Sequence, residues 1–306
     1  MNRNEIAQSA VAALRMARFS VTTFLDSNTC FDIIARNQTG TLLIKVYENI
    51  DSVRKEQADE LFKLGQVLNA SCTILGAKTK VFGMQDGTVY FRYGIPAITL
   101  ETFEKALRNE SPNSRYFKGK YIVDMDSNAL RRKRDEMKLS LQELAQKVGV
   151  ASETLYRFEH GASTTEDTAK RIGHELKGDF TKKFEVFGHG TERKKIDEVP
   201  DERLLEKVRE LGVKMALFEH APFNAFGEVE RGLLISTGKG NADIPKKAGE
   251  LSKTSKVIGS DSLIITKEYK RKSVGGILVL EESDLETISK VKDLRKLIEE
   301  REKDEE

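Results

Sequence analysis

Four side chains within residues 152–157 are of the kinds that read hydrogen-bonding patterns. Ser152 and Tyr156 carry hydroxyls, Glu153 carries acceptor oxygens, and Arg157 is a planar donor that stays charged. Arg157 can hold two parallel acceptors, such as the O6 and N7 atoms of guanine, while Glu153 can accept from cytosine N4. These residue types predict a polar, hydrogen-bonding surface, provided that one rigid element presents them together.

A helix with a defined start and end precedes these residues. Ser140 and Glu143 form an S-x-x-E capping box, which predicts a helix that begins at Leu141. Gly149 follows the last apolar residue of that helix, and glycine takes the left-handed conformation that closes a helix at little cost. A second helix can therefore begin within two or three residues.

The second helix, predicted over residues 152–160, has two unlike sides. Leu155 and Phe158 give it a narrow apolar stripe, and the hydrogen-bonding residues fall on the opposite side. Residues 130–137 and 164–176 predict further helices before and after this pair. The cations at residues 131–134 are, taken alone, more typical of a solvated helix face than of a nucleic-acid patch.

The whole stretch of residues 128–176, NALRRKRDEMKLSLQELAQKVGVASETLYRFEHGASTTEDTAKRIGHEL, resembles the helix-turn-helix domain of the lambda repressor and Cro (XRE) family. The resemblance implies that residues 152–160 are a recognition helix that enters the major groove of DNA. It implies base contacts from Ser152, Glu153 and Arg157, with Tyr156 nearby. Some members of this fold bind proteins or RNA, which stays an alternative.

The same resemblance implies contacts to the DNA backbone and one structural ion pair. Leu141 stands where the family usually has glutamine, and it cannot hydrogen-bond a phosphate. Arg134 and Glu159 stand where the family often ties its first and third helices together. The residues at the implied phosphate-contact positions, other than Leu141, are Ser140, His160 and Ser163.

The N-terminal third alternates helices and strands in the order α-β-β-β-α-β-β-α. This order predicts a mixed sheet covered by helices. The expected elements are helix 4–17, strands 21–25, 31–36 and 41–47, a helix from 51 or 52 to 68, strands 73–76 and 87–93, and helix 100–109.

The order and spacing of these elements resemble the restriction-endonuclease-like nuclease fold, particularly archaeal Holliday-junction resolvases. In those enzymes an Asp on one strand and a Glu-x-Lys on the next hold Mg²⁺ and the attacking water. Here Asp32 occupies the Asp position, but Lys45 stands in place of the Glu and Tyr47 in place of the Lys. An ammonium repels the metal, and Glu5 alone cannot compensate. We therefore expect no catalytic residues, no metal and no cofactor, and Asp32 is otherwise a polar residue at the start of a strand.

The C-terminal third repeats the first pattern. TLLIKVYE in the first part aligns with GLLISTGK in the second, which indicates an internal duplication with Asn224, Ser236 and Gly238 at the degenerate positions. Residues 232–240, GLLISTGKG, only weakly resemble a phosphate-binding loop. The expected elements are helix 201–211, strands 214–218, 223–230 and 232–237, helix 241–254, strands 262–266 and 275–280, and one helix from residue 284 onward.

We predict an α+β multidomain chain, with a central all-α helix-turn-helix domain between two α/β mixed-sheet, nuclease-like domains. Within the first linker, residues 115–121, RYFKGKY, either form an edge strand or lie along a phosphate backbone. The C-terminal helix either packs on its own sheet or forms a coiled coil. The predicted boundaries are 1–111 for the first domain, 112–127 for a linker, 128–177 for the helix-turn-helix, 178–200 for a second linker and 201–306 for the last domain.

Composition limits the class of protein. The chain has 306 residues and a net charge of only +2, so attraction to nucleic acid must be local. Cys30 and Cys72 show no ligand spacing, which argues against zinc sites and disulfides and favours the cytoplasm. No apolar run approaches the roughly 18 residues of a membrane span, and we expect no membrane association.

Three functional hypotheses follow. The chain as a whole resembles archaeal helix-turn-helix regulators with a central Cro-type motif, which implies a transcriptional regulator that binds double-stranded DNA as a homodimer, with the transcription machinery as a further possible partner. The second hypothesis is an Mg²⁺-dependent, structure-selective DNA nuclease. The third is a protein-interaction scaffold.

Overall fold

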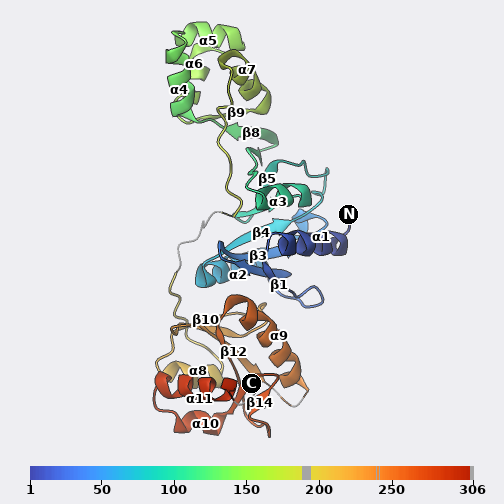
Figure 1. The fold of residues 1–306 in the computed structure, drawn as a ribbon, viewed down its shortest axis with the longest axis vertical. Coiled ribbons are helices and arrows are strands. Elements are labelled where there is room, and N and C mark those ends of the chain that lie inside the picture. The colour runs from blue at the N-terminus through green and yellow to red at the C-terminus, as the bar shows by residue number, and fades with distance from the viewer. Residues whose placement is uncertain (188–193, 239, 241, 304–306) are drawn as a thin grey trace. The chain divides into compact units, whose positions relative to one another are not determined.

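A computed structural model describes residues 1–187, 194–238, 240 and 242–303 (Figure 1). Along the chain, four helices of the helix-turn-helix segment stand between two mixed sheets, so the α+β multidomain fold predicted from the sequence is confirmed. Packing divides the chain into two compact units, one with the helix-turn-helix segment and one with the C-terminal sheet, and the N-terminal residues contribute to both. The domain boundaries given above stay a prediction.

The N-terminal sheet has the strand order β1-β2-β3-β4-β6-β5-β7-β8-β9. Residues 41–46 of β3 are all buried, as expected for an apolar strand near the middle of a sheet with both faces covered. Its first elements are α1 (Arg3–Met16), β1 (Ser20–Thr23), β2 (Ile33–Asn37), β3 (Gly40–Val46), a 3₁₀ turn (Ile50–Ser52), α2 (Lys55–Leu68), β4 (Ala70–Leu75), β5 (Thr88–Arg92), β6 (Ile95–Ile98) and α3 (Leu100–Leu107).

Strand β6 is absent from the prediction made from the sequence. A two-residue turn joins β5 to β6, with Tyr93 at φ 52° and Gly94 at φ 83°. Two consecutive positive φ angles are typical of a type I′ hairpin turn, which usually signals itself by Asn-Gly or Asp-Gly. Because tyrosine occupies the first position, the sequence does not indicate this turn, and the prediction therefore omits the strand that follows it.

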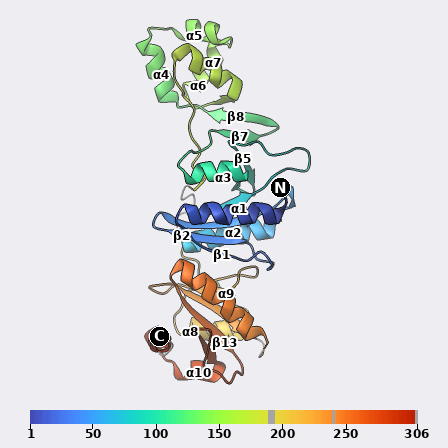
Figure 2. The same ribbon diagram turned by 45° about the vertical axis from the view of Figure 1, so that its right-hand side comes forward.

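The segment 112–127, predicted as a linker, contains a β-hairpin. Strand β7 (Ser114–Phe117) pairs in parallel with β5 and antiparallel with β8 (Lys120–Asp124), so β7 is not an edge strand either. Lys118 and Gly119 make the turn with φ angles of 47° and 81°. β8 also pairs with β9 (Ser163–Thr165), a strand that the sequence analysis missed. Figure 2 shows the β7–β8 hairpin beside the helix-turn-helix segment.

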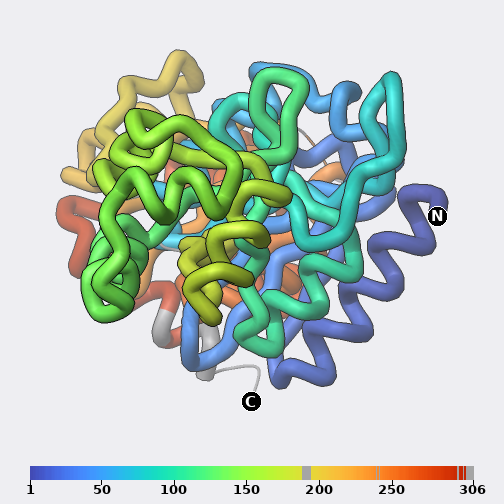
Figure 3. The backbone as a smooth tube through the Cα atoms, turned by 90° about the horizontal axis from the view of Figure 1, so that it is seen from above, coloured from blue at the N-terminus to red at the C-terminus, as the bar shows by residue number. Residues whose placement is uncertain are grey.

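The helix-turn-helix segment consists of α4 (Ser127–Glu136), α5 (Leu141–Val148), α6 (Ser152–Phe158) and α7 (Glu166–Leu176). Figure 3 looks down onto these helices, which are drawn in green to yellow-green. They enclose a dry core whose buried members are Val123, Met125, Leu130, Leu144, Ala145, Val148, Leu155, Phe158, Ala169, Ile172, Leu176 and Phe180. Two boundaries differ from the predicted helices 152–160 and 164–176: α6 ends at Phe158 and α7 begins at Glu166. Differences of about two residues are normal for helix boundaries.

Part of the predicted linker 178–200 is anchored to other elements. Phe184 packs edge-on against Phe91 with ring centroids 5.5 Å apart, and Phe187 packs against Phe103 at 5.6 Å. The backbone N–H of Lys182 donates to the carbonyl of Asp124 at 2.7 Å. Residues 178–187 therefore follow a fixed path, and residues 188–193 of the same segment lie outside the described residues.

The C-terminal sheet repeats the topology of the first six strands of the N-terminal sheet. Its order is β10-β11-β12-β13-β15-β14, which matches β1-β2-β3-β4-β6-β5 strand for strand. This match supports the internal duplication read from the sequence. Its elements are α8 (Arg203–Glu210), β10 (Met215–Leu217), β11 (Ala225–Gly227), β12 (Leu233–Gly238), α9 (Asp243–Ile258), β13 (Asp261–Thr266), β14 (Ser273–Val274) and β15 (Ile277–Glu281).

Strand β12 decides between two interpretations of residues 232–240. All six residues of Leu233–Gly238 are buried and pair with β11 and β13. A phosphate-binding loop needs exposed backbone N–H groups in this stretch. The weak resemblance to such a loop is therefore wrong, and Lys239 lies outside the described residues.

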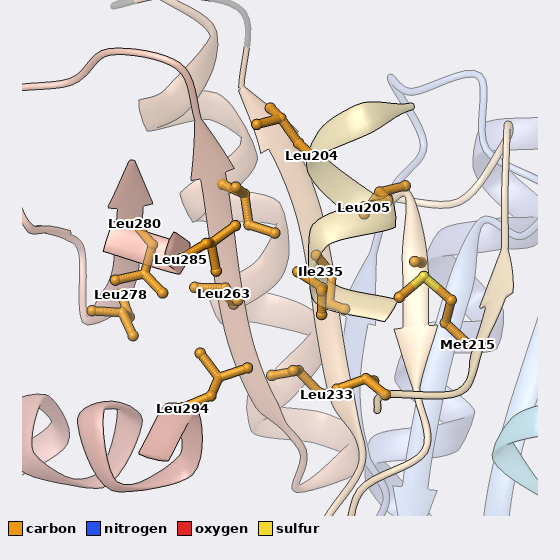
Figure 4. Close-up of a cluster of buried hydrophobic side chains, with 14 of the residues drawn as sticks. Leu204, Leu205, Met215, Leu233, Ile235, Leu263, Leu278, Leu280, Leu285 and Leu294 are labelled. Atoms are coloured by element: carbon orange, nitrogen blue, oxygen red, sulfur yellow. The ribbon is translucent and has the colours of Figure 1, made fainter. Parts of the chain in front are cut away.

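The single C-terminal helix expected from residue 284 onward is in fact two helices, α10 (Glu282–Thr287) and α11 (Val291–Lys303). Ile288 is extended between them at φ −91° and ψ 120°. Leu285, Ile288, Leu294 and Ile298 all join the core of the C-terminal sheet, to which Figure 4 shows Leu263, Leu278 and Leu280 contributing as well. The helix thus packs on its own sheet, the first of the two alternatives. Within the described residues no helix has the length and apolar character of a membrane span.

Candidate nucleic-acid interface

Helix α6 buries one side in the core of the helix-turn-helix segment. Leu155 is fully buried and Phe158 is 6% exposed, and both belong to the same apolar cluster as Leu144 and Ile172. Their spacing of three residues puts them on one face of the helix. The apolar stripe predicted from the sequence therefore determines which face of α6 is buried and which is exposed.

The opposite side of α6 presents all four predicted base-contact residues to solvent. Ser152, Glu153, Tyr156 and Arg157 are exposed, and 46% of Tyr156 is accessible. Among the described residues, no ion pair or side-chain hydrogen bond engages Glu153 or Arg157. This face thus offers a free planar donor beside a free carboxylate, on a helix narrow enough for the roughly 12 Å major groove.

The turn between α5 and α6 is set by Gly149. It adopts φ 73° and ψ 41°, and its N–H and that of Val150 return to carbonyls in the last turn of α5. Arg171 donates to the carbonyl of Val148 at 2.6 Å, which satisfies a further carbonyl at the same end. No local pattern indicates this role of Arg171, since it lies 23 residues from its acceptor.

The far end of α6 is tied to α4 by a buried ion pair. Arg134 Nε lies 2.7 Å from Glu159 Oε1, and Nη2 lies 3.0 Å from Oε2, so the pair is bidentate. The bond to Glu159 raises the pKa of Arg134 above its ordinary value. Nη1 also donates to the carbonyl of Leu139 at 2.8 Å. Arg134 and Glu159 thus form the structural pair expected from the family resemblance.

A second tie between α4 and α6 was missed by the sequence analysis. The Ser127 hydroxyl, at the start of α4, donates to the carbonyl of Phe158 at 2.9 Å. This bond satisfies one of the carbonyls left unpaired at the end of α6. A serine near the start of a helix is usually interpreted as a capping residue. Nothing in the neighbouring sequence therefore indicates that Ser127 bonds to a different helix.

Two of the three predicted phosphate-contact residues lie exposed at opposite ends of the turn region. The Ser140 hydroxyl accepts from the N–H of Glu143 at 3.2 Å, in the predicted capping box, which leaves its O–H available as a donor. His160 stacks on Tyr156 with ring centroids 4.0 Å apart, and its Nδ1 lies 2.7 Å from the Tyr156 carbonyl. A carbonyl oxygen can only accept, so Nδ1 carries a proton in this contact.

Ser163, the third such residue, lies in β9 and is already engaged. Its hydroxyl donates to Asp124 Oδ1 and accepts from Arg115 Nη2 at 3.1 Å. Arg115 also pairs with Asp124 at 2.9 Å. A hydroxyl has one proton, so Ser163 reaches a phosphate only by giving up its bond to Asp124, and the predicted contact stays a prediction.

The degenerate nuclease position holds a buried ion pair. Lys45 Nζ lies 3.0 Å from Asp32 Oδ1 and donates to the carbonyl of Thr29 at 2.6 Å. The side chain of Lys45 is 9% exposed and that of Asp32 is 0% exposed. The ammonium thus stands beside the carboxylate that would hold Mg²⁺ in an active nuclease. No group of three or more potential metal ligands occurs among the described residues.

The same backbone position exists in the C-terminal sheet. The N–H of Asp32 donates to the carbonyl of Ile44 at 2.8 Å, and the N–H of Asn224 donates to that of Ile235 at 2.8 Å. Asn224 is therefore the structural equivalent of Asp32, as the internal alignment predicts. A neutral amide replaces the carboxylate in the second copy.

The next two positions are altered in both copies. Tyr47 is half-buried and Ser236 is 1% exposed. Both side chains are uncharged, so neither replaces the charged residue that the nuclease motif has at its position. At Gly238 an added Cβ would lie 2.7 Å from Cγ1 of Ile244. Packing thus excludes a lysine at residue 238 as the backbone stands.

Comparison with known proteins places these parts in families. Residues 3–112 match the model of the PD-(D/E)XK superfamily domain, and residues 130–182 match a helix-turn-helix model. The chain is 31% identical over 302 residues to a "Putative HTH-type transcriptional regulatory protein" of Archaeoglobus fulgidus, with 97% of each chain covered. The chain belongs to this family of archaeal helix-turn-helix proteins.

Other members of the family are similar over the same extent. Proteins of the same printed name from Pyrococcus horikoshii and Methanocaldococcus jannaschii are 30% and 29% identical, and 97% and 95% of this chain is covered. The likeness therefore includes both sheets as well as the helix-turn-helix segment. No solved structure matches the chain.

We expect replacement of Arg134 by methionine to leave Glu159 as an uncompensated buried charge, at a cost of about 3–5 kcal/mol. Native-state hydrogen exchange of the α6 amides measures this cost as a lower free energy of opening. The double variant Arg134→Met with Glu159→Leu should recover most of the loss.

The matched control for this prediction is Lys133→Met, on the same helix, whose partner Glu136 is 64% exposed at the side chain. An exposed pair of this kind contributes about 0–1 kcal/mol. If Arg134→Met destabilised α6 no more than this control, the ion pair would not be what holds the helix.

Proposed function

We propose that this protein is a sequence-specific DNA-binding transcriptional regulator of the cytoplasm, and that α6 reads base edges in the major groove. The observation that supports this most is the two-sided form of α6. Its apolar side is buried by the rest of the segment, while Arg157, Glu153 and their neighbours stay exposed. A partner with a narrow, hydrogen-bonding groove complements such a face.

The hydrogen-bonding chemistry favours duplex DNA over a protein partner. Tyr156 is the one large apolar side chain exposed on α6, whereas protein interfaces commonly present an apolar centre. Arg157 suits guanine O6 and N7, and Glu153 suits cytosine N4, so adjacent G·C pairs are the expected targets. Ser140 flanks this face with a hydroxyl that can donate to a phosphate, and in this proposal His160 lies beside the phosphate on the other side.

Dimerisation follows from the small number of base contacts. Each good bidentate contact gives about 1–3 kcal/mol of discrimination, and one copy of α6 offers only one such donor. Two copies on half-sites about one helical turn apart double the readout, and symmetric pairing is common for this motif. We therefore propose a homodimer on a palindromic operator.

The flanking domains, in this proposal, have no catalytic role and serve in assembly or in non-catalytic binding. The name PD-(D/E)XK spells a motif with a second acidic residue two positions before a lysine. Lys45 and Tyr47 stand at these two positions here. With its ammonium 3.0 Å from Asp32, Lys45 neutralises the one carboxylate left to bind a divalent cation.

Replacement of Arg157 by alanine should weaken binding to the preferred sequence by about 1–3 kcal/mol, roughly 5- to 150-fold, because one bidentate base contact is lost. Binding to unrelated duplex DNA should change little. In vitro selection of the bound sequence by the wild type, followed by titration of both proteins on that duplex, measures the difference.

Arg108→Ala is the matched control, since this exposed arginine at the end of α3 pairs with Glu110 outside the helix-turn-helix segment. It should bind as the wild type does. If Arg157→Ala kept the sequence preference of the wild type, α6 would not be the helix that contacts the bases. Absence of salt-dependent DNA binding by the wild type would favour the scaffold hypothesis.

We also expect the wild type to leave duplex and four-way-junction DNA intact in the presence of Mg²⁺ or Mn²⁺. The reason is that the Lys45 ammonium occupies the surroundings of Asp32. Gel analysis of end-labelled DNA checks this. Metal-dependent cleavage that disappears in Asp32→Ala would instead establish the nuclease hypothesis.

A further inference from the structure

We infer that the outer face of the three-stranded ribbon β7–β8–β9 is a second DNA-contacting surface, which holds the sugar-phosphate backbone beside the bases read by α6. This inference rests on the proposed function of α6. It develops the second of the two alternatives given above for the basic and aromatic residues 115–121, which lie outside both family models.

The strand register sorts the ribbon into two faces. Phe117 stands opposite Lys120, and Arg115 stands opposite Ile122, so these four residues share one face, because directly opposed residues point the same way. Pairing of β8 with β9 adds Ser163 to that face. The contacts of Arg115 with Ser163 agree with this placement.

The opposite face of the ribbon is filled by aromatic packing. Tyr116 lies 5.2 Å from Tyr121, 5.4 Å from Tyr90 and 5.2 Å from Phe82, measured between ring centroids. Tyr90 is fully buried and its hydroxyl lies 3.4 Å from that of Tyr121. These contacts anchor the ribbon from behind and leave its other face to a partner.

The free face is basic. Arg115 neutralises Asp124 in a 2.9 Å ion pair, whereas Lys118 and Lys120 are exposed and make no ion pair with any described residue. Phe117 is 50% exposed, with Lys118 Nζ 5.3 Å and Arg115 Cζ 5.7 Å from its ring centroid. The Lys118 ammonium lies over this exposed ring, and Lys120, opposite Phe117 in the strand register, adds a second ammonium unpaired among the described residues. Such a surface complements phosphates and deoxyribose better than it complements an apolar protein surface.

The ribbon is fixed to the helix that reads the bases. β9 begins five residues after the end of α6, and all three residues of β9 pair with β8. The N–H of Asp126 donates to the carbonyl of Phe180 at 2.7 Å, which ties the end of β8 to the segment that follows α7. The ribbon therefore keeps its place when α6 docks.

The ribbon is wide enough to extend past more than one phosphate. β7 lies two strands from β9, about 10 Å away, and this distance equals the rise of about three nucleotides along the DNA helix axis. The family resemblance puts a phosphate near Ser163 in β9. A DNA backbone that passes Ser163 can thus continue across Arg115 towards Lys118 and Lys120. The two lysines then supply phosphate contacts that the engaged hydroxyl of Ser163 does not.

The test compares the full-length wild type with the double variant Lys118→Ala and Lys120→Ala on the duplex selected by the wild type. Binding is titrated over a range of KCl concentrations. We expect the slope of log affinity against log salt to fall by about 2, because each phosphate contact releases about 0.9 counterion. The preferred base sequence should not change, and hydroxyl-radical footprints should lose protection at the flank of the half-site.

Lys267→Ala with Lys270→Ala removes two exposed lysines from the C-terminal sheet and is the matched control, with an unchanged slope expected. An unchanged slope and footprint in Lys118→Ala with Lys120→Ala, while Arg157→Ala still loses sequence preference, would overturn the inference and leave the proposed function standing. Absence of DNA binding by the wild type would remove both. Loss of binding to another protein, with DNA binding intact, would assign the ribbon to a protein partner and overturn the inference as well.

Discussion

A helix of two turns does not hold its own shape in water, and α6 has only seven residues. Its conformation therefore depends on what holds its back and its end. Leu155 and Phe158 bury the back, and the Arg134–Glu159 pair with the Ser127 hydroxyl fixes the end. Because these contacts use the inner side and the C-terminal end, the outer side stays free for a ligand. Rigidity of a reading helix and freedom of its reading face thus come from the same set of contacts.

The two sheets balance charge differently at the position where the nuclease motif has its first carboxylate. Asp32 and Asn224 occupy the same place in the backbone hydrogen bonding of their sheets. In the first copy Lys45 compensates the buried carboxylate, and in the second copy an amide removes the charge altogether. Either solution avoids an unpaired buried charge, which costs several kcal/mol. Neither position therefore needs a bound cation to balance a buried charge.

Much of the architecture could be predicted from the sequence because its signals are local. The capping box at Ser140, the glycine at residue 149 and the apolar spacing within α6 each act within one or two turns. Strand β6 was missed, because Tyr93 takes the left-handed conformation where asparagine or aspartate usually precedes the glycine of such a turn. A strand or hairpin was compatible with residues 116–122, but the edge position expected for residues 115–121 was wrong, since the pairing of β7 with β5 joins residues far apart in the sequence. The roles of Ser127, Arg115 and Arg171 depend on acceptors far along the chain. Distant pairing of this kind leaves no pattern in a single sequence.

The central claim is that α6 meets bases through the major groove, and methylation interference on the selected duplex tests it most directly. Methyl groups at guanine N7 lie in the major groove, and those at adenine N3 lie in the minor groove. The account predicts that N7 methylation within the half-site abolishes binding, whereas N3 methylation at the same positions is tolerated. Interference confined to adenine N3, with free binding to N7-methylated half-sites, would contradict it.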